Sequence, residues 1–108
     1  MNEIRIDDAK GAEQLYFYAG KDMIEIVEND QATTIKNSRT VTIEQAGDQL
    51  IIEKGDLKVD VQAGNETHAI NGNYSQDVSG NCEIKVKGNL TIDATGNVVI
   101  KGAKVFLN

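Results

Sequence analysis

The side chains with the most chemical potential in this sequence are one histidine and a few scattered carboxylates. His68 is the only histidine, and three copies of it meeting on a symmetry axis could bind a metal or an anion, because imidazole is a common ligand. The alternative is a core-facing side chain bonded to water or to a neighbour such as Glu66, and we favour it. No set of Cys and His residues has the spacing of a zinc site, so we expect no metal and no cofactor.

Acid–base catalysis is the second chemistry to consider, because paired carboxylates cleave glycosidic bonds. Glu25, Glu53 and Glu66 are candidates, but no insertion longer than two residues interrupts the surrounding pattern to form a cleft. Cys82 is the only cysteine and is expected to be a small apolar core residue rather than a reactive thiol. We therefore expect no catalytic residue and no enzymatic activity.

A spacing of eight residues organises the chain that carries these side chains. One octad fits a strand of about five or six residues and one tight corner. A fixed short period is typical of a solenoid or fibre, in which each unit buries its apolar face by stacking on neighbours. Glycine at each corner is expected to supply a positive φ. The predicted corner glycines are Gly47, Gly55, Gly64, Gly72, Gly80, Gly88 and Gly96.

Apolar residues alternate with polar ones between these corners, at positions three, five and seven of the octad. Because strand side chains alternate faces, these residues point to one side and the Lys, Asp, Glu and Thr residues between them to the other. The predicted core residues are Leu57, Val59, Val61, Ile70, Val78, Cys82, Ile84, Val86, Leu90 and Ile92.

Two segments can be separated along the sequence. Residues 1–20 are not octadic and are predicted to be an entry or neck segment. In it, Ile4 and Ile6 alternate with polar neighbours, a turn surrounds Gly11, and residues 15–19 form an apolar strand. Residues 21–108 are the octad array, with one inserted residue at Ala63 and two near residues 45–46.

Polar side chains on the inward positions decide how many chains close the structure. In a single chain most of them would be unpaired, at a cost of roughly 1–3 kcal/mol each. Around a three-fold axis, equivalent side chains can bond one another or hold water. We therefore predict an all-β fold, an intertwined trimeric triple-stranded β-helix built from octad repeats. The polar inward residues are Gln31, Thr33, Arg39, Glu66, His68 and Gln76.

Charge and hydropathy exclude several function classes. The net charge of −6 opposes nucleic-acid binding, which needs clustered cations, and adhesion to anionic lipid. No run approaches the roughly 18 apolar residues of a membrane span, so no stable membrane insertion is expected. No charged-then-apolar segment opens the chain, and export by the general secretory route is not indicated.

The octads resemble the needles of contractile-injection spikes, namely the VgrG proteins of type VI secretion and the central spike of contractile phage tails. Their unit of Val, any residue, then Gly stands here as Val78-Ser79-Gly80 and Val86-Lys87-Gly88. The opening stretch IRIDDAKGAEQLYFYAGKDM is similar to the segment that leads VgrG chains into their needle. The hub domains that precede the needle in full VgrG chains are missing, which predicts either a needle fragment or a small stand-alone spike.

The resemblance implies a structural homotrimer that punctures membranes. Tube or hub proteins would join its N-terminal end, and a proline-alanine-alanine-arginine (PAAR) tip protein or an effector its C-terminal end. Such a spike is assembled in the cytoplasm and injected into a target cell, or carried on a phage virion tail. Val105, Phe106 and Leu107 are the predicted tip-docking residues, unless Phe106 only plugs the core. The alternative function is a trimeric phage fibre or adhesin shaft that binds a surface glycan or receptor.

Overall fold

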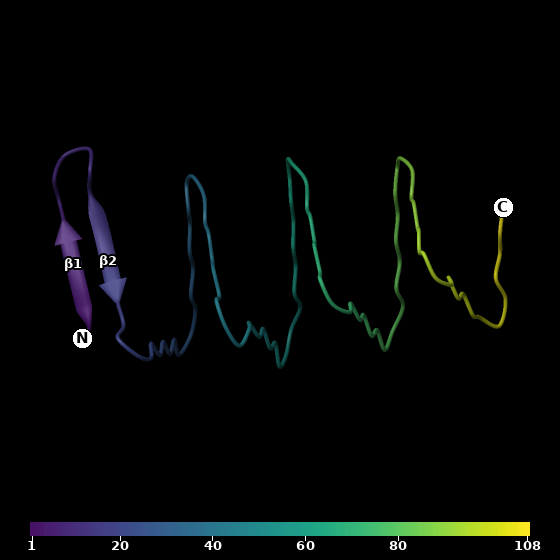
Figure 1. Cartoon of the computed structure of the whole chain (residues 1–108), viewed down its shortest axis with the longest axis horizontal. Helices are drawn as coiled ribbons and strands as arrows, with labels where there is room; N and C mark the ends of the chain where they lie inside the picture. Colours follow the sequence, from purple (N-terminus) through teal and green to yellow (C-terminus); the bar gives the residue numbers. More distant parts are fainter. The chain divides into compact units, whose positions relative to one another are not determined.

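The computed structural model describes residues 1–108, and its hydrogen-bonded sheet consists of two strands (Figure 1). Strand β1 runs over Glu3–Asp7 and strand β2 over Gln14–Tyr18, and the two are antiparallel. The register places Ile4 opposite Phe17 and Ile6 opposite Leu15. One face of the hairpin is therefore apolar, because residues two apart on a strand share a face.

The turn between β1 and β2 is held by short-range hydrogen bonds. The backbone N–H of Ala9 donates to the Asp7 carboxylate at 3.0 Å, and that of Ala12 donates to the Ala9 carbonyl at 2.9 Å. Gly11 has a φ of 84°, which glycine adopts without steric cost, and its N–H donates to Glu13 at 2.9 Å. The predicted alternating strand, turn around Gly11 and apolar strand are confirmed.

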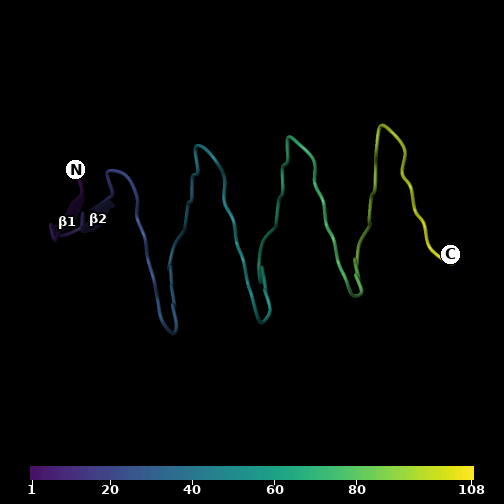
Figure 2. The ribbon, with the colours of Figure 1, turned by 90° about the horizontal axis from the view of Figure 1, so that it is seen from below.

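The rest of the chain consists of extended segments separated by bends, without a helix (Figures 1 and 2). Because it has strands and extended segments but no helix, the fold is all-β, as predicted. The bends recur after eight or nine residues, at residues 20–21, 28–29, 36–37, 45–46, 53–55, 62–64, 71–72, 79–80, 87–88, 95–96 and 103.

Corner glycines fall into two groups by backbone conformation. The expected positive φ is present at Gly47 (118°), Gly55 (101°) and Gly64 (123°). It is absent at the other corner glycines, where the prediction of a positive φ is wrong. The two groups differ in corner length: Gly55 and Gly64 close three-residue bends, and Gly47 follows the bend at residues 45–46 as the third residue of a hydrogen-bonded turn, whereas the later bends have two residues and no such bond. We attribute the left-handed glycine to the extra residue that a longer corner must accommodate. The glycines without a positive φ are Gly72, Gly80, Gly88 and Gly96.

Ala46 is the one residue other than glycine with a positive φ, at 73°. The backbone N–H of Gly47 donates to the Gln45 carbonyl at 2.9 Å, so Ala46 is the centre of a three-residue turn. Such a turn with a positive central φ is rare and strained for a residue with a Cβ. The turn lies at the two-residue insertion identified in the sequence, which places the irregularity of the repeat in a corner.

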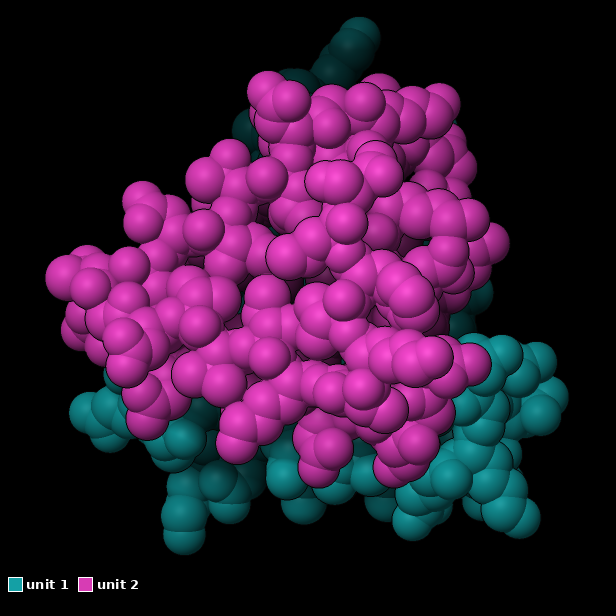
Figure 3. All heavy atoms as spheres, turned by 90° about the vertical axis from the view of Figure 1, so that its right-hand side faces the viewer, with its two compact units in different colours: residues 1–56 teal, residues 57–108 magenta.

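Residues 1–56 and residues 57–108 form two compact units, coloured teal and magenta in Figure 3. Neither unit has a buried core, since no side chain of either is buried. The predicted boundary between a neck of residues 1–20 and an array of residues 21–108 separates two sequence patterns, and it stays a prediction.

Candidate functional site

The apolar residues of the octad array form the candidate functional surface, because the isolated chain leaves them uncovered. The chain exposes 12635 Å², whereas a folded monomer of this mass exposes about 5,900 Å² by the usual scaling of surface with mass. An excess of about twofold means that this chain alone does not bury enough apolar surface to offset the conformational entropy of folding.

The predicted core residues are all exposed in the single chain. The exposed fractions of the nine residues other than Cys82 range from 44% at Val78 to 71% at Ile84, and Cys82 is exposed too. Their burial therefore depends on other chains, and their role as a core stays a prediction.

The backbone hydrogen bonds also indicate that the chain needs partner chains. Besides the β1–β2 ladder, the only backbone–backbone hydrogen bonds are that of Ala12 in the hairpin turn and that of Gly47. Residues 57–108 have none, so their extended segments carry unpaired N–H and C=O groups on both edges. A single-chain solenoid would show ladders between its successive coils. The extended segments are instead open to strands from other chains, since buried backbone groups in proteins are almost always paired.

A periodic row of half-covered apolar residues precedes the bends. Each of its members exposes 42–50% of its surface and lies immediately, or one residue, before a bend. Apolar residues farther from a bend, such as Leu57 and Val59, expose 63% and 68%. The bend thus covers the apolar side chain before it. The members of this pre-bend row are Val27, Ile35, Ile43, Ile52, Val61, Ile70, Val78 and Val86.

Sequence reasoning missed the first four members of the pre-bend row as core candidates. The predicted core was taken only from octads that begin with glycine, whereas the bends at residues 28–29 and 36–37 contain no glycine. The signal was present in the sequence, because a β-branched residue stands just before each of these corners. The row therefore continues into the irregular part of the array.

His68 and Glu66 are brought together on one extended segment. The Nε2 atom of His68 lies 2.8 Å from Oε1 of Glu66, which is the neighbour interaction expected from the sequence. His68, Ile70 and Tyr74 line a shallow hollow of about 290 Å³. These three residues occupy positions five, seven and three of consecutive octads, all of them predicted to face inward.

The other candidate carboxylates do not converge on a common site. The Glu25 carboxylate accepts a hydrogen bond from the Gln31 side-chain amide at 3.1 Å. Glu66 is occupied by His68, and no hydrogen bond or ion pair involves Glu53. No helical segment has the length and apolarity that crossing a membrane demands.

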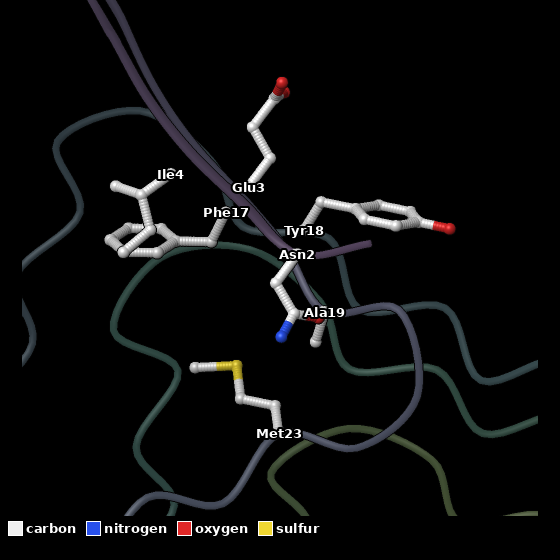
Figure 4. Close-up of a pocket in the computed structure, with 7 residues that line it drawn as sticks. All are labelled: Asn2, Glu3, Ile4, Phe17, Tyr18, Ala19 and Met23. Carbon is white, nitrogen blue, oxygen red and sulfur yellow. The ribbon is translucent and has the colours of Figure 1, made fainter.

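An apolar hollow of about 420 Å³ lies beside the hairpin and includes Ile4, Phe17 and Met23 (Figure 4). The rings and chains of these residues face the same space, with Ile4 beside the Phe17 ring and Met23 on the opposite wall (Figure 4). Asn2, which also lines this hollow, accepts a hydrogen bond at its Oδ1 from the Gly20 N–H at 2.8 Å.

The predicted tip residues follow the bend at residue 103. Val105 exposes 50% of its surface, Phe106 87% and Leu107 88%. Among the exposed large apolar residues, only Met1 at 89% is more exposed than Phe106 and Leu107.

These features define a class: an all-β structural chain that has no core of its own and completes its fold against other chains. The chain matches the bacteriophage T4 gp5 C-terminal trimerisation domain over residues 1–101, and it belongs to that family. The resemblance to the needle of contractile tail spikes is thereby confirmed. Comparison with curated proteins and with solved structures gave no match.

Proposed function

We propose that the chain is the membrane-puncturing needle of a trimeric contractile-injection spike, with three copies intertwined in a triple-stranded β-helix. One observation carries the proposal: the trimerisation-family match spans a periodic array whose backbone and apolar side chains are uncovered in one chain. Three copies supply both the missing strand partners and the missing core. A phage virion tail is the setting favoured by the family, and a type VI secretion machine is the second.

The proposed mechanism is mechanical. Each octad adds one layer that rises about 4.8 Å along the axis, so some ten octads make a rod roughly 50 Å long. Hydrogen bonds between strands run along that axis and resist compression. The net charge of −6 keeps the outer surface soluble and disfavours retention in anionic lipid. We expect no catalytic turnover from this chain.

The oligomeric state of the purified chain tests the proposal. Sedimentation equilibrium should show a trimer of the 11.7 kDa chain, without a folded monomer on dilution. A compact, β-rich monomer would contradict both the trimer and the needle.

The inward register is tested by Ile84→Asp. Three carboxylates would then lie close to the axis without partners, at a cost on the order of several kcal/mol for each desolvated charge. Thr91→Asp, at a predicted outward position, is the matched control. Loss of assembly by I84D together with retention by T91D supports the register, whereas equal melting temperatures would show that it is wrong.

We further propose that residues 103–108 receive a PAAR-like tip protein or an effector. Phe106 and Leu107 are almost fully exposed and present a small apolar face. Deletion of residues 104–108 should leave the trimer folded but abolish the capture of a cognate tip protein in a pull-down. Undiminished capture would exclude this end as the docking surface. Hub or tube proteins are proposed to join the opposite, N-terminal end.

A further inference from the structure

The octad pattern alone does not fix how the octads of three chains align with one another, whereas the non-repeating hairpin can fix it. The octads that begin at Gly72, Gly80 and Gly88 are alike in length and corner, so over this part of the array three chains can pair after a slip of one whole octad and keep their inward and outward faces. Residues 1–20 do not repeat. They also contain the only paired strands in the chain, so their strand pairing is made within one chain.

The hairpin is amphipathic, and the side chains of its polar face contact one another. On its polar face, Arg5 lies over the Tyr16 ring at 4.7 Å from the centroid and 3.8 Å from the Glu3 carboxylate. Tyr16 and Glu3 are the only half-buried residues of the chain, and all others are exposed. That face therefore needs no partner.

The apolar face of the hairpin is uncovered. Its residues, which form two directly opposed cross-strand pairs, expose 58–72% of their surface. Hollows of about 420 and 380 Å³ flank it, one beside the first pair and one beside the second. An isolated two-stranded hairpin is marginally stable in water and needs cover on its apolar face. The face consists of Ile4, Ile6, Leu15 and Phe17.

We propose that copies of this chain meet first through the apolar face of the β1–β2 hairpin, and that this contact sets the register of the octad array. The occupant is a second copy because the trimerisation-family match starts at residue 1 and includes the hairpin together with the array. None of the array's segments is paired with another segment of its own chain, so the array has no strand register before chains meet. The inference rests on the proposed trimer.

Spin labels on an outward residue can report the register. Lys85 is suitable because its side chain is 85% exposed and pairs only with Glu83, at 3.1 Å. With a nitroxide attached to Lys85→Cys in a Cys82→Ala background, the three labels of an in-register trimer should lie on three different faces. A slip of one octad carries one label onto a neighbour's face, about 4.8 Å away, and broadens the spectrum strongly.

The hairpin variant is Ile4→Ser with Phe17→Ser, and the matched control is Leu90→Ser with Ile92→Ser, which removes comparable apolar groups from the array. We expect the full chain and the control to give a narrow spectrum, and the hairpin variant to gain the broadened component. Phe17→Ser alone is the milder variant if the double one does not assemble. Failure of both hairpin variants to assemble, while the control assembles, also supports the hairpin contact.

A hairpin variant that forms trimers with the narrow spectrum of the full chain would overturn the inference and assign the register to the array. A control that gains the broadened component as strongly as the hairpin variant would overturn it as well. If the unsubstituted chain forms no trimer, the proposed function fails, and that result is seen by sedimentation before any label is read.

Discussion

His68 and Glu66, two residues apart on one extended segment, are joined by a 2.8 Å contact between Nε2 and Oε1. Both occupy inward positions at which the preceding octad has the apolar residues Leu57 and Val59, whereas the following octad has Tyr74 and Gln76. In the proposed trimer, three such pairs form a polar layer that separates the apolar layers before it from the mixed layers after it. The pairing satisfies two groups that would each be costly to bury alone.

The first prediction concerns this polar layer. His68→Ala should lower the stability of the trimer by roughly 1–3 kcal/mol per chain, because it leaves the Glu66 carboxylate without its partner. His68→Ala combined with Glu66→Ala should recover part of that loss, and thermal melting of both variants in a double-mutant cycle measures the coupling. Additive losses would mean that the two side chains do not interact in the assembled protein.

The second prediction compares two corner glycines. Gly64 has a φ of 123°, whereas Gly88 has no positive φ and a Cβ built on it meets nothing within 4 Å. Gly64→Ala should destabilise by about 1–2 kcal/mol per chain, because a Cβ is strained in that conformation. Gly88→Ala should be neutral or stabilise by about 0.4–1 kcal/mol through the unfolded chain. Denaturant unfolding measures both, and equal losses would contradict the division of corners by length.

The third prediction concerns the strained turn at the insertion. Ala46→Gly should raise the free energy of unfolding by about 1 kcal/mol per chain, because glycine adopts the positive φ of 73° without a Cβ clash. Ala63→Gly is the control, since Ala63 has no positive φ and should only lose stability. A lower melting temperature for A46G would show that the turn is not strained.

The fourth prediction is a pH dependence in the hairpin. The backbone N–H of Gly11 donates to the Glu13 carboxylate and, with the residue's own N–H, lowers the pKa of Glu13 below its ordinary value of 4.5. A lowered pKa in the folded state means that the carboxylate stabilises the turn above pH 4.5. This contribution is lost as the pH falls through the folded-state pKa.

A carbon-detected titration of the Glu13 carboxyl by nuclear magnetic resonance measures that pKa directly. Glu13→Gln should remove the corresponding step from the pH dependence of hairpin stability. A Glu13 carboxyl that titrates at or above 4.5 would contradict the hydrogen bond from Gly11.

Local signals in the sequence predicted the hairpin well, because strand alternation around Ile4 and Ile6 and the turn at Gly11 depend only on near neighbours. The corners were predicted from the spacing of eight, and bends are present at residues 28–29 and 36–37 as well, where the octads begin with Asn rather than glycine. The sign of φ at Gly72 or Gly88 was not predictable from residue type, since it depends on corner length. The core could be predicted only as an alternating pattern, because other chains must bury it.

The parity of the repeat limits how this array can change in length. Eight is an even number, so adding or removing one octad between Gly72 and Gly96 leaves every later side chain on its original face. The two-residue corners there need no left-handed backbone, which makes their octads interchangeable units of about 4.8 Å in rod length. An odd insertion inside an extended segment would turn every following side chain over. Ala63, the single-residue insertion, lies in the three-residue corner 62–64, where the odd residue is absorbed before the next strand begins.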